Sequence, residues 1–189
     1  MTIKNLFKMS YLVPISAFIV SLCAIIISII EVRVMDEQKK ASVWPITYSS
    51  RTTHSVTDID KSSFFINVTN SGVGPAIIKY VEVKFDGKII KTWDEMLQNI
   101  EKDTELNVSQ SVLTNNVILP GEEHHPLEVY GKLADKLNRD TKRIRLKICY
   151  CSIYEECWIL DESEPRMAGL AIPHKTEQCE IDRKNQFLR

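Results

Sequence analysis

The chain has 189 residues, 44% of them hydrophobic, and its 24 basic and 25 acidic residues give a net charge of −1. That length is enough for one domain with a sizeable core. Because basic and acidic residues are interspersed, the sequence lacks the concentrated positive charge on which proteins bind nucleic acid. We therefore expect no direct nucleic-acid binding.

Part of the apolar content lies in one uninterrupted segment. Residues 11–30, YLVPISAFIVSLCAIIISII, contain no charged residue. About 20 helical residues, at roughly 1.5 Å each, match the roughly 30 Å hydrocarbon core of a bilayer. We predict a single transmembrane helix in contact with the lipid bilayer. Ser16, Ser21 and Cys23 are small residues that would let a second such helix approach closely, which makes self-association through the span a further expectation.

A signal peptide and a buried core helix both fit this segment less well than a membrane span. A cleavable signal peptide has a shorter apolar region and a small-residue cleavage site, whereas this segment continues directly into Glu31, Val32 and Arg33. A buried core helix of this length would carry a polar stripe. The segment is therefore expected to be retained as an anchor.

The flanking charges do not fix the orientation of the span. Two basic residues, Lys4 and Lys8, precede it, and three follow it: Arg33, Lys39 and Lys40. An uncleaved anchor this close to the N-terminus usually leaves that terminus inside and exports the rest. We expect an exported domain, with a cytoplasmic domain as the open alternative.

Beyond the span, polar residues 31–41 predict a helical stalk. From Val43 onward, short runs rich in Val, Ile, Thr, Phe and Tyr alternate with turn residues, which predicts strands. The expected strands are residues 42–50, 62–70, 76–85, 106–113, 116–119, 125–130, 142–152 and 157–161.

Two glycine motifs separate these strands. Asp86-Gly87 predicts a two-residue hairpin, because both central residues of such a turn need a positive φ. Residues 70–76, NSGVGPA, lack the Lys and Ser/Thr of a phosphate-binding loop and lie between strands. They predict a tight connection in which Gly72 and Gly74 take positive φ.

One helix is expected among the strands. Thr92 and Glu95 match a capping box. The apolar residues that follow have the spacing of an amphipathic helix: Trp93, Met96, Leu97 and Ile100. Trp93 is therefore expected to pack in the core rather than stack on a ligand. Residues 131–140 predict a loop or a short helix.

About seven short strands with one inserted helix predict a mainly β fold, an Ig-like antiparallel β-sandwich that follows the transmembrane helix. The last segment has little periodicity, which indicates a tail laid over the domain or partly free of it. The predicted organisation is an N-terminal tail (1–10), a transmembrane helix (11–30), a juxtamembrane stalk (31–41), a β-sandwich domain (42–162) and a C-terminal tail (163–189).

The region beyond the span contains four cysteines: Cys149, Cys151, Cys157 and Cys179. Cys149 and Cys151 share one face of a strand. If the hairpin loop is residues 153–155, Cys151 lies opposite Cys157, where a disulfide can form; a loop of two or four residues puts Trp158 there instead. Cys179 is then left as a possible partner for Cys149, although four cysteines allow three connectivities and the sequence does not choose among them. In the cytoplasm they would be ordinary thiols.

We predict no metal ion, no cofactor and no catalytic residue. A C-x-C pair on an extended strand splays its ligands, unlike the C-x2-C knuckle of structural zinc sites. His124 and His125 are adjacent and so point to opposite faces of a strand. The sequence contains neither G-x-S-x-G nor H-E-x-x-H. An enzyme whose site is assembled from scattered residues, in a polar pocket near either histidine or Cys149, is the remaining enzymatic alternative.

Three segments carry a resemblance: ASVWP, FFINVTNSGVGPAIIKYVEVKFDGK and ICYCSIYEECW. Together they resemble a loose group of bacterial single-pass, membrane-anchored β-sandwich proteins with a VWP strand, an N-x-G-x-GPA turn and a late Y-x-S-x-Y/F hairpin. The resemblance covers residues 41–161. It implies a membrane-anchored β-sandwich and no catalytic residue. With the orientation expected above, the domain lies on the periplasmic side of a bacterial inner membrane, and a cytoplasmic domain stays the open alternative.

Two functions follow as hypotheses. The first is a non-catalytic module that presents the β-sandwich to a partner protein beside the membrane. Its expected contact surfaces are an edge strand and the inserted helix, with Val43, Trp44, Ile46, Trp93 and Met96. The second is a membrane-disrupting effector of a bacterial anti-phage system such as a retron, acting through its transmembrane helix.

Overall fold

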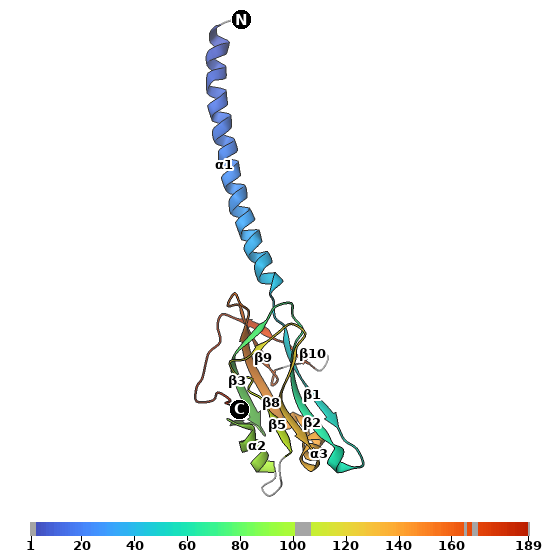
Figure 1. Ribbon diagram of the computed structural model, residues 1–189. Helices are drawn as coiled ribbons and strands as arrows, with labels where there is room; N and C mark the ends of the chain where they lie inside the picture. Colours follow the sequence, from blue (N-terminus) through green and yellow to red (C-terminus); the bar gives the residue numbers. More distant parts are fainter. Residues whose placement is uncertain (1–2, 101–106, 165, 168–169, 189) are drawn as a thin grey trace. The chain divides into compact units, whose positions relative to one another are not determined.

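The computed structural model describes residues 3–100, 107–164, 166–167 and 170–188, with side chains described for 14–100, 107–164 and 170–188. The chain divides into two compact units, residues 1–42 and 43–189. Figure 1 traces the elements of each unit along the chain.

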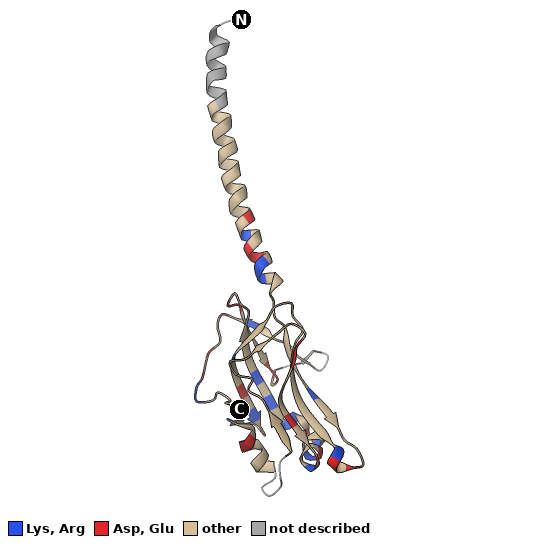
Figure 2. Ribbon diagram, in the orientation of Figure 1, with Lys and Arg blue, Asp and Glu red and all other residues tan. Residues whose placement is uncertain are grey.

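The first unit is one continuous helix, α1 (Ile3–Ser42). An 18-residue window within its Pro14–Ser42 portion has a mean hydropathy of 2.6, and none of that window is buried. Within residues 14–42, the charged residues lie toward the C-terminal end of the helix (Figure 2), where Lys40 Nζ lies 2.9 Å from the Asp36 carboxylate. The predicted apolar helix and its helical stalk are therefore confirmed.

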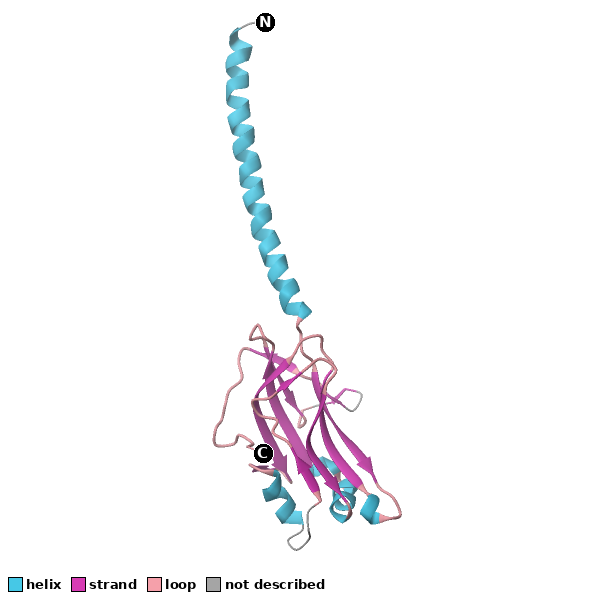
Figure 3. Ribbon diagram, viewed as in Figure 1, coloured by secondary structure: helices cyan, strands magenta, loops and turns pink. Residues whose placement is uncertain are grey.

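The second unit is mainly β and contains two antiparallel sheets (Figure 3). The first sheet has the order β1 (Thr47–His54), β2 (Ser63–Asn70), β7 (Glu123–Tyr130), β5 (Val108–Gln110). The second has the order β12 (His174–Thr176), β9 (Cys157–Asp161), β8 (Ile144–Cys151), β3 (Ala76–Phe85), β4 (Lys88–Ile90), and β6 (Val117–Ile118) also pairs with β3. A separate ribbon joins β10 (Arg166–Met167) to β11 (Leu170–Ala171).

Short helices connect some of these strands. They are the 3-10 turns η1 (Ile59–Lys61) and η2 (Thr141–Arg143) and the α-helices α2 (Trp93–Ile100) and α3 (Lys132–Arg139). Among the described residues the β domain thus has two α-helices, and of the two alternatives expected for residues 131–140, a loop or a short helix, the helix is present.

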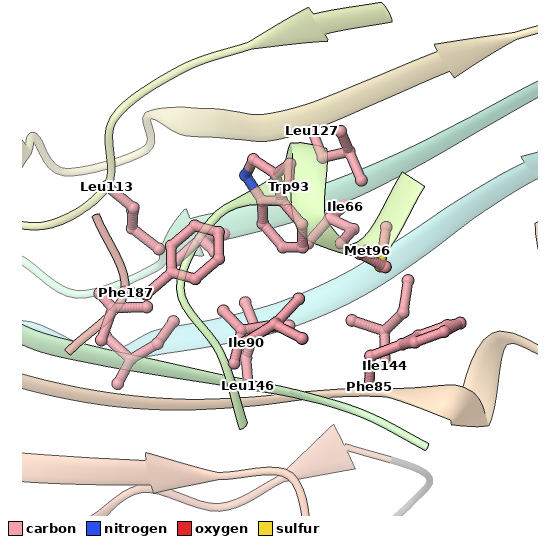
Figure 4. Packing of buried hydrophobic residues seen from close by; sticks show 14 of the residues in the cluster. Ile66, Phe85, Ile90, Trp93, Met96, Leu113, Leu127, Ile144, Leu146 and Phe187 are labelled. Carbon is pink, nitrogen blue, oxygen red and sulfur yellow. The ribbon is translucent and has the colours of Figure 1, made fainter. Parts of the chain in front are cut away.

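Both sheets contribute to one core. Phe64, Ile66 and Val68 alternate along β2 and are fully buried, as the period of two predicts. They belong to the same cluster as the alternating residues of β8: Ile144, Leu146, Ile148 and Tyr150. Figure 4 shows Trp93 and Met96 of α2 among core side chains of both sheets.

The burial of α2 overturns part of the predicted partner surface. Trp93 is 1% exposed and Met96 is 0% exposed, so neither is available to a partner. The spacing that makes this helix amphipathic turns both side chains into the core. The predicted N-terminal cap is present, since Thr92 Oγ1 accepts a hydrogen bond from the backbone N–H of Glu95 at 3.2 Å.

Residues 43–46 are not the expected edge strand. They precede β1 and run along the loop that follows β2, where the backbone N–H of Val73 donates to the Trp44 carbonyl at 3.0 Å and that of Ser71 to the Ile46 carbonyl at 2.8 Å. A Cβ at Gly74 would lie 2.0 Å from the Val43 carbonyl oxygen. The loop therefore needs glycine because another backbone segment packs against it.

The φ angles correct one turn prediction and confirm another. Positive φ occurs at Gly87, Gly121 and Gly131 among the described glycines, so the positive φ predicted for Gly72 and Gly74 is wrong. The predicted Asp86-Gly87 hairpin is present, with φ of 48° and 79°.

The C-terminal segment is an integral part of the β domain. Strand β12 pairs with β9, with His174 opposite Ile159. Phe187 is buried, and its ring lies 4.6 Å from that of Trp93, edge to face. The backbone N–H of Phe187 donates to the Val81 carbonyl at 2.8 Å. The segment is therefore laid over the domain, which is one of the two arrangements expected for it.

Candidate functional site

Four loops place exposed apolar side chains at one end of the β domain, the end at which the chain enters it. We call this set the apolar end; each of its residues is between 43% and 66% exposed. Its members are Trp44, Ile46, Val73, Leu119, Ile153 and Tyr154.

The strand registers explain why these loops share one end. Thr47, the first residue of β1, pairs with Asn70, the last of β2. On the second sheet, Ile77 near the start of β3 pairs with Cys151, the last residue of β8. The loops outside these pairs are therefore neighbours, although residues 44 and 154 lie far apart in the sequence.

Asn70 ties three of these segments together from a fully buried position. Its Oδ1 accepts hydrogen bonds from the backbone N–H groups of Ile46 at 3.2 Å and Gly72 at 3.0 Å. Its Nδ2 donates to the carbonyls of Gly74 at 2.8 Å and Ile118 at 2.9 Å. Both ends of the amide are thus satisfied, which fixes the loops that present the apolar end.

An aromatic stack supports Trp44. Its ring centroid lies 6.2 Å from that of Trp158, and Trp158 lies 5.9 Å from Tyr150. The Tyr150 hydroxyl accepts a hydrogen bond from the backbone N–H of Thr47 at 3.2 Å, and burial raises its pKa. Half of Trp44 remains exposed on this rigid base, an arrangement typical of aromatic anchors in protein interfaces.

The opposite end of the domain carries charged side chains. Ion pairs join Asp86 to Arg143 at 2.5 Å and Asp58 to Lys61 at 3.0 Å. The guanidinium of Arg143 holds the pKa of the Asp86 carboxyl below its usual range. Exposed apolar side chains occur at this end too, at Ile59, Ile89 and Tyr130, but Trp44 and the more exposed Tyr154 lie at the apolar end.

The four domain cysteines form two disulfides, Cys149–Cys179 and Cys151–Cys157. Cys151 pairs directly with Cys157 in the β8–β9 register, so the arrangement expected for a loop at residues 153–155 is confirmed. The backbone N–H of Ser152 donates to the Glu156 carbonyl at 2.8 Å and closes that loop.

The two disulfides touch each other. Sγ of Cys151 lies 3.7 Å from Sγ of Cys179, and the sulfur atoms of Cys151, Cys157 and Cys179 all lie within 4.8 Å of one another. This spacing would suit a metal ion only if the sulfurs were thiolates, whereas each is bonded to another sulfur. In this form the four sulfurs are therefore disulfide sulfurs and offer no thiolate ligand to a metal ion.

A polar cavity of about 420 Å³ adjoins Cys149, with Tyr80, Glu82 and Lys147 among its lining residues. The disulfide leaves Cys149 without a thiol. The Tyr80 hydroxyl donates to Glu82 at 3.1 Å, and burial together with the Glu82 charge raises its pKa, which keeps it protonated. The cavity thus offers neither a thiolate nor a phenolate nucleophile at these two residues.

The adjacent histidines face different neighbours, as the strand geometry predicts. His124 Nε2 lies 3.0 Å from Ser111 Oγ, and His125 Nδ1 lies 3.0 Å from Asn67 Oδ1. Glu162, a buried carboxylate beyond β9 that accepts hydrogen bonds from Arg51, is not among the residues predicted from the sequence. A single acidic residue after a strand is ordinarily exposed, so the sequence does not predict that Glu162 is buried.

The predicted packing residues of the span lie on a helix whose described side chains are exposed within the chain. Ser21 Oγ donates to the Ala17 carbonyl at 2.8 Å, so its polar group is satisfied within the helix. Cys23 is a free, exposed thiol. Helix–helix packing through Ser16, Ser21 and Cys23 stays a prediction.

No protein-family model, curated protein or solved structure matches this chain. The N-terminal apolar helix and the β domain fit a single-pass membrane protein, and the two disulfides suggest an oxidising compartment.

Proposed function

We propose that this chain is a non-catalytic, single-pass protein of a bacterial inner membrane, whose exported Ig-like domain binds a partner protein through the apolar end. The observation that carries the proposal is the gathering of exposed bulky apolar side chains from four loops at one end of the domain. Loops are ordinarily polar, and exposed apolar groups gathered in one region mark interaction sites.

The strand order supports the Ig-like assignment. The orders β1-β2-β7-β5 and β9-β8-β3-β4 correspond to A-B-E-D and G-F-C-C′ of an Ig-type sandwich. The disulfides depart from that pattern, since they join β8 to β9 and to the C-terminal segment instead of bridging the two sheets.

The disulfides also support export. Disulfides persist in oxidising compartments such as the periplasm and are rare in the bacterial cytoplasm. An exported domain matches an anchor whose short N-terminal segment stays in the cytoplasm. A partner would then lie in the periplasm or project into it from the inner membrane.

The residue types at the apolar end favour a protein as its occupant. Exposed Trp, Tyr and Ile side chains there suit a protein interface.

Site-specific photocrosslinking in cells tests the proposal. A photoreactive residue at Tyr154 or Leu119 should give an adduct of the same mass, and the exposed residue Thr52 on β1 serves as the control position. Val73→Asp should abolish the adduct from Tyr154 while both disulfides still form. Equal adducts from Thr52, or no adduct from either apolar position, would refute the binding surface.

The effector hypothesis makes a different prediction about the span. Induced expression of an effector should depolarise cells, and a scrambled but equally apolar sequence at residues 11–30 should remove that effect. Depolarisation that depends on the native span sequence would replace the partner-binding proposal with the effector.

A further inference from the structure

The two disulfides are in contact through one sulfur atom of each: Cys151 from the Cys151–Cys157 disulfide and Cys179 from the Cys149–Cys179 disulfide. Cys149 and Cys151 alternate along β8 and share the face covered by the segment that contains Cys179. Sγ of Cys151 and Sγ of Cys179 are 3.7 Å apart, which is van der Waals contact between two sulfur atoms that are not bonded to each other. A thiolate formed at either atom therefore adjoins a disulfide that it can attack.

An external thiol can reach the cluster at two cysteines: Cys179, which is half-buried, and Cys157, which lines a cavity. Cys179 is half-buried, whereas Cys149, Cys151 and Cys157 are buried. A cavity of about 410 Å³ is lined by Cys151, Cys157 and Cys179, and Lys79 and Gln178 also line it. The centre can thus be reached from outside, and accessible disulfides are the ones that take part in exchange.

We propose that the four cysteines form a disulfide-exchange centre, in which a two-electron reduction of either native disulfide by a dithiol reductant yields the same new bond, Cys151–Cys179. The reductant is any molecule with two neighbouring thiols, either a small dithiol or a dithiol protein of the exported compartment. The product has one central disulfide and free thiols at Cys149 and Cys157.

The first route begins at the half-buried residue Cys179. A thiolate of the reductant attacks Cys179, the Cys149–Cys179 bond breaks, and Cys149 leaves as a thiolate that takes a proton from water. The second thiol of the reductant then attacks the mixed disulfide between the reductant and Cys179 and releases Cys179 as a thiolate. The reductant is thereby oxidised to its own disulfide and has supplied both electrons. The Cys179 thiolate attacks Cys151, forms Cys151–Cys179 and releases Cys157 as a thiolate, which is protonated.

The second route begins at the hairpin. The reductant attacks Cys157 through the cavity, the Cys151–Cys157 bond breaks, and its second thiol then releases Cys157. The Cys151 thiolate attacks Cys179, forms Cys151–Cys179 and expels Cys149. The two routes converge because the two sulfurs in contact come from different disulfides.

The exchange changes one end of the domain selectively. The C-terminal segment remains bonded to β8, now through Cys151 instead of Cys149. The bond that closes loop 152–156, which carries Ile153 and Tyr154, is lost. Control of partner binding by this change rests on the proposed function, whereas the exchange chemistry does not.

Partial reduction of the full chain in detergent tests the exchange directly. One equivalent of dithiothreitol is added, thiols are trapped with maleimide after acid quenching, and the protein is cut with trypsin and with a glutamyl protease, which separates Cys157 from Cys149 and Cys151. The expected major one-disulfide species links Cys151 to Cys179, with maleimide on Cys149 and Cys157. Fragmentation between residues 149 and 151 assigns the link.

Either of two products without exchange would overturn the inference. A remaining Cys149–Cys179 bond with labelled Cys151 and Cys157 would show that the hairpin disulfide is reduced without exchange. A remaining Cys151–Cys157 bond with labelled Cys149 and Cys179 would show the same for the other disulfide. Both readouts are independent of any partner, so failure of the exchange and failure of the binding surface are distinguishable.

A double variant gives a second measurement that needs no reductant. Cys149→Ser with Cys157→Ser leaves Cys151 and Cys179 as the domain's two thiols. They are expected to oxidise to the central disulfide under the conditions that oxidise the wild-type chain. If both thiols remain open to maleimide in a variant that keeps its β-sheet circular dichroism, the contact does not support exchange.

Discussion

Glu162 joins the two sheets through a single buried carboxylate. It accepts hydrogen bonds from Arg51 Nη1 at 3.0 Å and Nη2 at 2.8 Å, and from the Ser49 hydroxyl, all on β1. It also accepts from the backbone N–H of Leu146 on β8 at 2.8 Å. The charge is buried but fully paired, so removal of one partner leaves the other charge without compensation.

We expect Glu162→Ala to lower the free energy of unfolding by about 3 kcal/mol, because the Arg51 side chain, only 12% exposed, is left without its carboxylate partner. Lys175→Ala is the matched control: its partner Glu156 lies 2.7 Å away, but Lys175 is exposed, and an exposed pair contributes roughly 0–1 kcal/mol. Urea unfolding in detergent measures both. Equal losses from the two variants would show that the buried pair does not join the sheets.

His124 makes stability depend on pH. Burial lowers the pKa of His124 below its ordinary value of 6.5, the charge of neighbouring His125 lowers it further, and Glu122 opposes the shift. As the pH decreases through about 6.5, His124 is protonated more readily in the unfolded chain than in the folded chain. The free energy of unfolding therefore falls as the pH decreases through this range. His124→Gln should flatten this dependence, and His54→Gln at an exposed position should not. Thermal unfolding across this pH range measures it, and an unchanged slope in His124→Gln would assign the effect elsewhere.

The sequence predicts the structural role of some of these residues and not of others. The alternation of Cys149 and Cys151 and a loop centred on Tyr154 are enough to place Cys151 opposite Cys157. For the second bond, elimination leaves Cys179 as a possible partner of Cys149, but nothing local in the sequence shows that Cys179 returns to β8. For Asn70 the sequence predicts only a place in a turn, although its four hydrogen bonds depend on backbone groups from three segments.

At the scale of elements, α2 and the C-terminal segment differ in how well the sequence predicts them. The period of α2 is clear and its cap is present, yet the surface role predicted for Trp93 conflicts with that same period. The C-terminal segment has no period at all. It is held by β12, by Cys179 and by Phe187, three separate contacts that leave no regular mark in the sequence.

We expect Phe187→Ala to destabilise the domain by about 3–5 kcal/mol, because it empties a core site beside Trp93. The adjacent Leu188 is 60% exposed, so Leu188→Ala should cost roughly 0.5 kcal/mol or less. Denaturant midpoints of the two variants provide the comparison. A small effect from Phe187→Ala would mean that the segment contributes little beyond its disulfide.

At the scale of the whole molecule, the compartment of the domain links the disulfides to the orientation of the span. Maleimide-polymer labelling in spheroplasts and in lysed cells, with and without reductant, separates the two orientations. We expect Cys149, Cys151, Cys157 and Cys179 to be labelled in intact spheroplasts only after reduction. Labelling that needs lysis but no reductant would place the domain in the cytoplasm with free thiols, and would favour the effector hypothesis.

Local sequence patterns are enough to predict the apolar helix, its helical stalk, most strands, the Asp86-Gly87 hairpin and the capped helix. Each depends on neighbours within about eight residues, through a period of two or 3.6 or through a turn that only certain residues adopt. The tertiary structure was needed to show why Gly72 and Gly74 are glycines, where the C-terminal segment lies and that Cys179 pairs with Cys149. Those outcomes are contacts between distant segments, and they form only when two sheets close on one core.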